Sequence, residues 1–310
     1  MSFEPVRLNV RQTDATKLYH SFANAPTSAM AILTIHSHVS CGHVGNSAAV
    51  YPLQAIGHEV WPVHTVLLSH HPGHGDWHGI CLEAADIISV LDGIEKHGVL
   101  PRCDAVLTGY LGSVDIGEAA LKSWSKVRSA NPSALIVCDP ILGDETEGLY
   151  VSKSLIEFYI ERAIPLADLI FPNRFELEVI SGMKVYDLHS AAAAARHVVA
   201  RGPKTVVATS IPADGNVATL LVTLDTALQV QTPNLKISIK GAGDVFAALF
   251  LGDVLARDVK PAETLSVAVD TVYALLEKVE AEGLQELPLR SISTPLGSHP
   301  MRYTASEFQR

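Results

Sequence analysis

Short apolar runs alternate with longer segments of helical periodicity along most of this chain. Six runs are typical of buried parallel strands, and they lie at residues 31–35, 59–66, 105–108, 135–138, 169–171 and 205–209. Helices are predicted between them, at residues 45–56, 80–97, 114–129, 152–163, 174–181 and 191–200. This alternation predicts an α/β fold in three layers, with a central, mostly parallel sheet and helices on both faces.

The pattern changes in the last third of the chain. Two apolar runs at residues 218–223 and 227–231 flank the polar turn Leu224-Asp225-Thr226, which predicts a β-hairpin. Two further helices are expected, beginning at Gly243 and at Pro261. The hairpin should therefore extend the parallel sheet at one end.

The alternation of apolar runs and helical segments also indicates how the chain is divided into domains. Residues 1–29 are polar and lack strong periodicity, so we interpret them as an N-terminal extension. No repeat, low-complexity linker or shift in composition divides residues 30–310, which indicates a single domain.

Composition and charge exclude several classes of protein. The chain has 310 residues, of which 48% are hydrophobic and 18% charged, as in ordinary globular proteins. A formal net charge of −10 without a basic cluster argues against binding to nucleic acid or a membrane surface. No apolar run approaches the roughly 20 residues needed to cross a bilayer. The four cysteines lie far apart in the sequence, which is typical of reduced thiols in a cytoplasmic protein.

The sequence Gly-Ala-Gly-Asp at residues 241–244 has the character of an anion site. Its two glycines allow a ligand to approach the backbone, and an apolar helix follows directly. The first N–H groups of a helix have no internal partner and favour an anion in front of them. Asp244 lies beside that site, where it could take a proton from a hydroxyl that attacks a phosphate. The alternative is an ordinary helix start with a favourable first-turn carboxylate.

Further polar residues follow the predicted strands, at the sheet edge where ligands bind in open α/β folds. They include Ser37, Thr65, Asp139, Asp144, Asn173, Glu176, Thr209 and Ser210. The carboxylates Asp139, Asp144 and Glu176 suit a hard cation such as Mg²⁺, with helix capping or surface solvation as the alternative. The chain has neither a Walker-type phosphate loop nor a dinucleotide fingerprint after its first strand.

The segment at residues 69–79 is dense in histidine, proline and glycine. Its four histidines could bind a transition metal such as zinc. Its glycines instead favour a mobile flap that lays His74 and Trp77 over a flat ligand. The plain alternative is a loop of solvated histidines.

Several motifs, taken in order, resemble the pyridoxal kinases of the ribokinase-like superfamily. The run at residues 35–49 is close to the family pattern Gln-Ser-His-Val-x-x-Gly-x-x-Gly-Asn-x-Ala-Ala. Matches continue at residues 61–66, 109–113, 138–144, 172–176 and 241–244. The resemblance spans roughly residues 31–255 and implies a ribokinase-like fold.

The resemblance also implies an activity, with ATP and Mg²⁺ as cofactors. The reaction would be phosphorylation of the 5′-hydroxymethyl group of pyridoxal, pyridoxine or pyridoxamine by MgATP. The family is commonly dimeric, so a homodimer is expected. We keep two alternatives: a hydroxymethylpyrimidine kinase, and a non-catalytic protein that binds pyridoxal 5′-phosphate.

The resemblance assigns a role to each matching residue. The substrate would be contacted by Ser37, Thr65, His74 and Asp244. The nucleotide would be bound by Asp139, Asn173, Glu176, Thr209 and Ser210. Mg²⁺ would be held by Asp139, Asp144 and Glu176. The anion hole would consist of Gly241, Ala242 and Gly243, with Asp244 as the catalytic base.

Three positions depart from the family pattern. Ala242 replaces a threonine, so a hydroxyl is lost while the backbone donors remain. Phe171 stands where many relatives have threonine, which leaves a side-chain ligand for a monovalent cation, K⁺ or Na⁺, open. His36 replaces the glutamine before Ser37.

Overall fold

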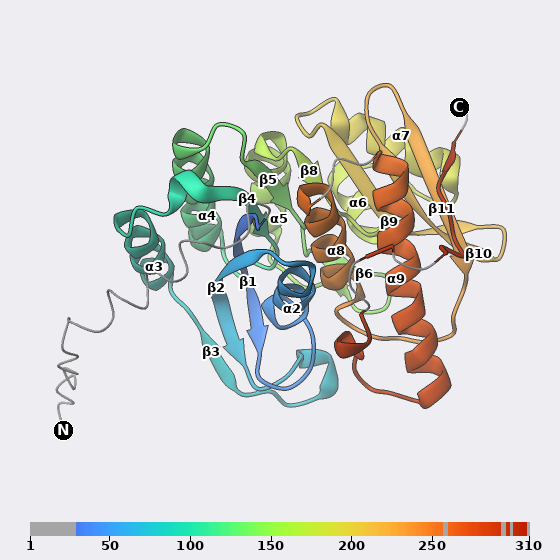
Figure 1. Cartoon of the computed structure of the whole chain (residues 1–310), viewed down its shortest axis with the longest axis horizontal. Helices are drawn as coiled ribbons and strands as arrows, with labels where there is room; N and C mark the ends of the chain where they lie inside the picture. Colours follow the sequence, from blue (N-terminus) through green and yellow to red (C-terminus); the bar gives the residue numbers. More distant parts are fainter. Residues whose placement is uncertain (1–28, 257–259, 293–295, 298–299, 309–310) are drawn as a thin grey trace.

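One sheet of ten strands runs through the described part of the molecule. Helices lie on both sides of this sheet (Figure 1). The computed structural model describes residues 29–256, 260–292, 296–297 and 300–308, so most of the predicted extension at residues 1–29 lies outside it. The strand order is β12-β11-β10-β9-β8-β5-β4-β1-β2-β3. In chain order the strands are β1 (Ala31–Val39), β2 (Glu59–Leu68), β3 (Gly79–Cys81), β4 (Cys103–Thr108), β5 (Leu135–Cys138), β8 (Leu169–Ile170), β9 (Thr205–Ala213), β10 (Asn216–Val222), β11 (Ala227–Pro233) and β12 (Ser306–Glu307).

The sheet is parallel in its centre and antiparallel at both ends. Strands β2, β1, β4, β5, β8 and β9 pair in parallel. The hairpin predicted after residue 217 is confirmed as β10 and β11, which continue the sheet beyond β9. A separate two-stranded hairpin, β6 (Gly143–Asp144) with β7 (Gly148–Leu149), follows β5.

Helices cover both faces of the sheet, and the predicted three-layer architecture is confirmed. One face packs against α3 (Ala84–Lys96), α4 (Val114–Ala130), α5 (Lys153–Phe158), α6 (Arg174–Ser181) and α7 (Leu188–Val199). The other packs against α2 (Asn46–Ile56), α8 (Ala242–Ala256) and α9 (Pro261–Glu282). Alternate residues of β1 enter the two cores, Ile32 on one side and Leu33 on the other, because successive strand side chains point to opposite faces.

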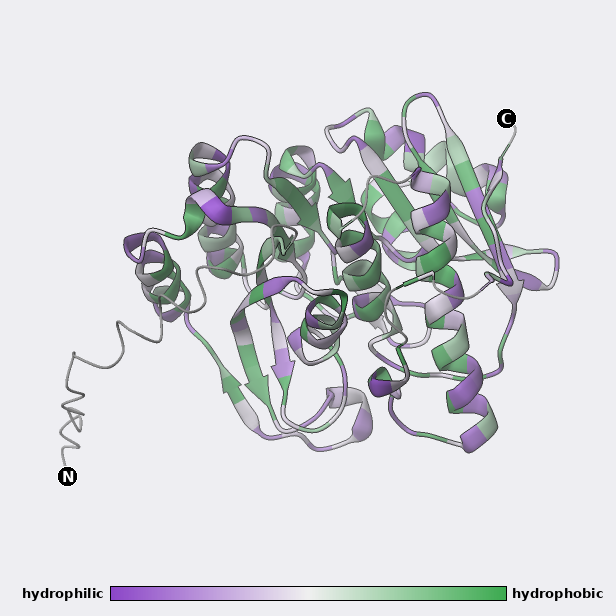
Figure 2. Ribbon diagram, viewed as in Figure 1, coloured by the Kyte–Doolittle hydropathy of each residue, from purple (hydrophilic) through white to green (hydrophobic). Residues whose placement is uncertain are grey.

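Helix α8 differs from the others in being apolar around its whole circumference. Its residues from Asp244 to Asp253 are all buried, and α2 and α9 pack against it. Figure 2 shows this helix and the central strands in green, whereas outer helices such as α3 and α9 carry purple segments. A helix that is apolar all round is stable only inside a core. The turn at residues 240–242, which leads into α8, is therefore fixed in position by the packing of α8 in the core.

Two predicted helix starts are wrong, and one predicted helix is irregular. The helix expected from residue 80 begins at Ala84, because Gly79–Cys81 pairs with the end of β2 and a capping box at Glu83 starts the helix. The helix expected from residue 191 begins at Leu188, where Asp187 caps it. The helix expected at residues 152–163 widens into a π-helical turn at Tyr159–Ala163.

The described residues contain no helix that is long and apolar enough to cross a membrane. The four cysteines are all free: Cys103 and Cys138 are buried, and Cys41 and Cys81 are exposed.

Candidate active site

A cavity of about 540 Å³ lies at the carboxyl ends of the central strands, in front of α8. Most of the residues expected to form a site line it: Ser37, Asp139, Asp144, Asn173, Glu176, Thr209, Ser210, Gly241, Ala242, Gly243 and Asp244. Thr65 and His74 do not. The structure therefore brings together residues from five separate loops and strands, as ligand sites in open α/β sheets require.

The turn before α8 has the geometry of an anion-binding site. Gly241 has a φ of 86°, and a Cβ at this position would lie 1.8 Å from the carbonyl oxygen of His43. Only glycine fits there. A Cβ on Gly243 would meet nothing within 4 Å, so this part of the turn is open. Because the first N–H groups of a helix have no acceptor within it, those at Ala242–Asp244 can bind an anion in the cavity.

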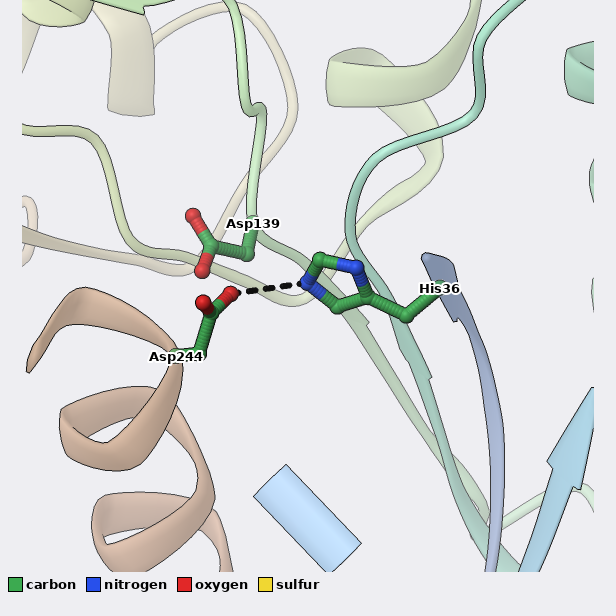
Figure 3. Close-up of side chains that lie close together, drawn as sticks. All are labelled: His36, Asp139 and Asp244. Carbon is green, nitrogen blue, oxygen red and sulfur yellow. Dashed lines mark ion pairs between the residues drawn. The ribbon is translucent and has the colours of Figure 1, made fainter. Parts of the chain in front are cut away.

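Asp244 lies in the first turn of α8 and is 9% exposed. One carboxylate oxygen, Oδ2, accepts the backbone N–H of Gly45 at 2.9 Å. The other, Oδ1, lies 2.9 Å from Nε2 of His36. Figure 3 shows His36, on β1, pointing toward Asp244, with Asp139 beside the pair. These contacts tie the start of α8 to β1 and to the loop that follows it.

The surroundings of His36 fix which of its ring nitrogens carries the proton in the neutral form. Nδ1 lies 2.8 Å from the backbone nitrogen of Ser37 and 3.2 Å from that of Tyr110, and both N–H groups donate to it. An acceptor of two N–H groups cannot itself carry a proton, so the neutral ring carries it on Nε2. Nε2 lies 2.9 Å from Oδ1 of Asp244 without the geometry of a hydrogen bond, and neither atom has another hydrogen-bond partner among the described residues. The ring fits because residue 109 is glycine, whose Cβ would lie 1.9 Å from Nε2.

His36, Asp139 and Asp244 are all buried, and one ligand atom of each lies within 4.8 Å of the others. Such a cluster could suggest a transition-metal site. A metal on Nε2 would require a proton on Nδ1, where the two backbone N–H groups point. Metal-ligating histidines instead donate from their second nitrogen. The three residues therefore form a polar cluster around Asp244 and do not suit a transition metal.

Asp139 and Glu176 are each only 3% exposed. Burial raises the pKa of Asp139 well above its usual value, and the nearby charges of Glu176 and Asp244 add to the effect. Burial also raises the pKa of Glu176 to about 8, although backbone N–H groups oppose the shift. Without a cation, these carboxyl groups therefore favour their protonated forms. A bound Mg²⁺ would supply the positive charge that makes two ionised oxygen ligands stable here.

Glu176 also caps a helix, which is the structural role considered above as the alternative to metal binding. It forms a capping box with Asn173 at the start of α6. Its Oε2 accepts the N–H of Asn173 at 2.8 Å, and its Oε1 accepts the N–H of Leu142 at 2.9 Å. Capping and a place in the cavity therefore coincide in one side chain.

Asp144, on β6, has every oxygen engaged. Its Oδ1 accepts the backbone N–H groups of Thr146 and Glu147, both at 2.8 Å. Its Oδ2 accepts from the Lys240 ammonium at 2.6 Å and from the Tyr150 hydroxyl. Partial burial alone would raise the pKa of Asp144, but these hydrogen bonds outweigh it and lower the pKa to about 2. Asp144 is thus ionised and paired.

Of the residues expected to contact the acceptor or the nucleotide, some line the cavity and one is buried behind it. Thr65 is fully buried and donates to the carbonyl oxygen of Tyr110 at 2.7 Å, behind the cavity wall. Ser37 lines the cavity. Ser210 also lines it, with a φ of 61°. That conformation costs a non-glycine residue about 1–3 kcal/mol, and strain of this kind is concentrated at functional sites.

The predicted flap at residues 69–79 forms the connection between β2 and β3. His71 and Trp77 line the cavity, whereas His74 points its ring toward Glu286, with Nε2 3.7 Å from Oε1. Glu286 also accepts the backbone N–H of His43 at 2.9 Å. The flap is therefore joined to the loop after β1 through one carboxylate, and His71 takes the place in the cavity that the sequence suggested for His74.

Sequence reasoning missed the roles of His36 and Lys240. A signal was present for both: His36 departs from the family pattern, and Lys240 directly precedes the Gly-Ala-Gly-Asp turn. Their contacts with Asp244 and Asp144 join parts of the chain that are distant in sequence, which no local pattern reveals.

Comparisons with known proteins show which proteins this chain is similar to. The family model described as phosphomethylpyrimidine kinase matches residues 98–289. The pyridoxal kinase PdxY of Rubrobacter xylanophilus is 46% identical over 278 residues, which cover 88% of this chain and 95% of that protein. The pyridoxal kinase of Leishmania donovani in complex with ADP is 27% identical, with a TM-score of 0.84 over 90% of this chain and 99% of that one. The same kinase with ADP and pyridoxamine is 28% identical, with a TM-score of 0.83 and the same coverage.

Proposed function

Because this chain belongs to the pyridoxal kinase family, we propose that its cavity transfers the γ-phosphoryl group of ATP to the 5′-hydroxymethyl group of pyridoxal. The fold is the ribokinase-like sandwich that the sequence resemblance implied. The observation that carries the proposal is the position of Asp244, a buried carboxylate at the edge of an open anion-binding turn. A carboxylate repels phosphate, so its presence beside a phosphate site indicates that it removes a proton from the attacking hydroxyl group.

Asp244 would act as the general base. It takes the proton from the 5′-hydroxyl group as the oxygen of that group forms a bond to the γ-phosphorus. The bond between the γ-phosphorus and the bridging oxygen breaks, and ADP leaves with that oxygen. The backbone N–H groups at Gly241, Ala242 and Gly243 stabilise the charge on the transferred group. Each of these groups is fixed in place by the buried helix behind it.

The nucleotide would be bound by Asp139, Asn173, Glu176, Thr209 and Ser210, which line the cavity. Asp139, Asp144 and Glu176 would hold Mg²⁺, whose role is to neutralise charge on the phosphates. Asp144 contributes only after its present partners have moved. A monovalent cation is left open, because Phe171 supplies no oxygen ligand from its side chain.

The vitamer would lie against β1 and under the flap. Ser37 is the polar group available on that side of the cavity, and Trp77 and His71 offer flat surfaces from the flap. Thr65 would act through the backbone of Tyr110, since its hydroxyl already donates there. His74 would act on the flap through Glu286. We further propose one catalytic domain over residues 30–310, a homodimer and a cytoplasmic location.

A second candidate is phosphorylation of hydroxymethylpyrimidine, because the matching family model is described as phosphomethylpyrimidine kinase, which names a related pyrimidine as its substrate. A non-catalytic pyridoxal-phosphate carrier is less well supported, since it would need no base at the anion site. An assay of ADP release with pyridoxal, pyridoxine, pyridoxamine and hydroxymethylpyrimidine separates the three. Turnover with B6 vitamers is expected. Turnover only with the pyrimidine, or none with any acceptor, would overturn the proposal.

A further inference from the structure

Lys240 is the one lysine or arginine among the described residues that line the cavity. It directly precedes Gly241, the first residue of the anion-binding turn. Five carboxylates line the same cavity: Asp139, Asp144, Glu147, Glu176 and Asp244. The members of this group that are ionised repel an entering polyphosphate, and Lys240 is the one lysine or arginine among the described lining residues that can offset their charge.

The ammonium group of Lys240 is held by the β6–β7 hairpin. Its Nζ lies 2.6 Å from Oδ2 of Asp144, 2.8 Å from Oε1 of Glu147 and 3.1 Å from the hydroxyl of Tyr150. These three contacts use all three donors of an ammonium group. The hairpin thus occupies the position of an anionic ligand in front of Lys240.

The same contacts conflict with the expected role of Asp144 as an Mg²⁺ ligand. Both oxygens of Asp144 already accept two hydrogen bonds each. An oxygen with both lone pairs engaged has none left for a cation. If Asp144 contacts the metal, Lys240 must first release it.

We propose that Lys240 binds the phosphate groups of the nucleotide, and that it exchanges Asp144 and Glu147 for them when MgATP enters. The exchange releases Asp144 toward the metal. This inference deepens the proposed kinase function and rests on it.

Exposure makes the exchange feasible. The side chains of Lys240, Asp144 and Glu147 are 22%, 29% and 40% exposed, so water reaches both ion pairs and can solvate the carboxylates once the ammonium group leaves them. A nucleotide polyphosphate offers the ammonium group more negative charge than a carboxylate does. Lys240 directly precedes Gly241 and lines the same cavity as the anion-binding turn, so a nucleotide bound at that turn is within the space that Lys240 faces.

The test compares two variants whose effects on nucleotide binding should have opposite signs. Affinity for ADP and for a non-hydrolysable ATP analogue is measured by calorimetry with Mg²⁺. Lys240→Gln removes the cation and should weaken binding about 10–100-fold, the usual value of a hydrogen bond to a charged group. Glu147→Gln removes a competitor for the ammonium and should tighten binding a few-fold. Lys240→Arg keeps the charge and should restore much of the affinity.

A merely structural tether predicts a different result. Both variants would then lower Tm, and neither would change nucleotide affinity by more than about two-fold, which would overturn the proposal. Lys184→Gln is the matched control, because Lys184 pairs with Glu178 at 2.8 Å outside the cavity. It should leave nucleotide affinity unchanged.

Binding separates this inference from the kinase proposal. If the wild-type protein binds nucleotide but phosphorylates no acceptor, the proposed function fails while the two variants still decide the role of Lys240. If the wild-type protein binds no nucleotide, the role of Lys240 is overturned as well.

Discussion

Asp244 is the single residue whose chemistry the kinase proposal requires. Asp244→Asn keeps the shape and removes the proton acceptor, so kcat should fall by about 10²–10⁴, the usual contribution of a general base. Affinity for pyridoxal and ATP should change little, because the anion-binding turn is built from backbone. Steady-state kinetics with a binding measurement would show this split.

A melting curve must accompany the Asp244 variant. The new amide nitrogen could face the N–H of His36, which lies 2.9 Å from the present carboxylate, and two donors would then oppose each other. A folded variant with kcat close to wild type would show that Asp244 only starts the helix and that the base lies elsewhere.

His36 is expected to position Asp244 through the close contact of its Nε2 atom with the carboxylate. His36→Gln keeps an N–H donor, as the family pattern does, and should retain most activity. His36→Leu fills a similar volume without a polar contact to the carboxylate, and kcat should fall about 10-fold, the value of one polar interaction with a charged group, with KM nearly unchanged. Nitrogen-15 NMR of the imidazole would test the tautomer directly. Equal kcat values for the two variants would count against a positioning role.

At the scale of elements, we propose that the flap at residues 69–79 closes the site. It is anchored at its base by pairing of β3 with β2 and at its tip by Glu286. Amide exchange in this segment should slow when pyridoxal and a non-hydrolysable ATP analogue are both bound, because closure excludes water that would accept the phosphoryl group.

Glu286→Gln provides the comparison for the flap. It removes the charge that faces His74 and His43, so exchange at residues 69–79 should be faster in the free variant than in the free wild type. Exchange that stays the same with both ligands bound would remove the lid role and leave a surface loop.

The elements were predictable from the sequence where packing and local pattern agree. Buried strands are short apolar runs because both of their faces are covered, and these were found at the correct places. The start of α3 was missed because Gly79–Cys81 forms a strand only by pairing with β2, a contact between segments that periodicity does not report. The same limit explains why His71 lines the cavity where His74 was expected, since the fold of the flap decides which histidine points inward.

At the scale of the whole molecule, the buried carboxylates couple stability to pH. The pKa of Asp139 is raised by burial and by the charges of Glu176 and Asp244. The native state therefore keeps this proton to a higher pH than the unfolded chain, and stability falls as pH rises from the unfolded value through the native pKa. Asp139→Asn removes this titration. At pH 8 without Mg²⁺ the variant should be more stable by about 1–3 kcal/mol, the cost of an unsatisfied buried polar group.

Thermal melts at pH 5 and pH 8 would measure this effect. The advantage of Asp139→Asn should be larger at pH 8 than at pH 5, and MgATP should raise the Tm of the wild type more than that of the variant. A variant that melts at a lower temperature than the wild type at both pH values would show that Asp139 stabilises the fold. It would contradict the view that Asp139 is kept as a metal ligand at a cost in stability.

The short strands at the two edges of the sheet affect whether neighbouring molecules can pair through their strands. The outermost strands are very short: β12 has two residues and β3 has three. Between them lies a row of mostly apolar strands whose backbone groups would pair readily with any extended chain. β12 pairs with Leu228 and Gln229 of β11, and β3 pairs with residues 66–68 of β2, so a short strand of the same chain covers part of each longer edge. The strand β12 thus protects this part of β11 from intermolecular pairing, the first step toward fibrous aggregates.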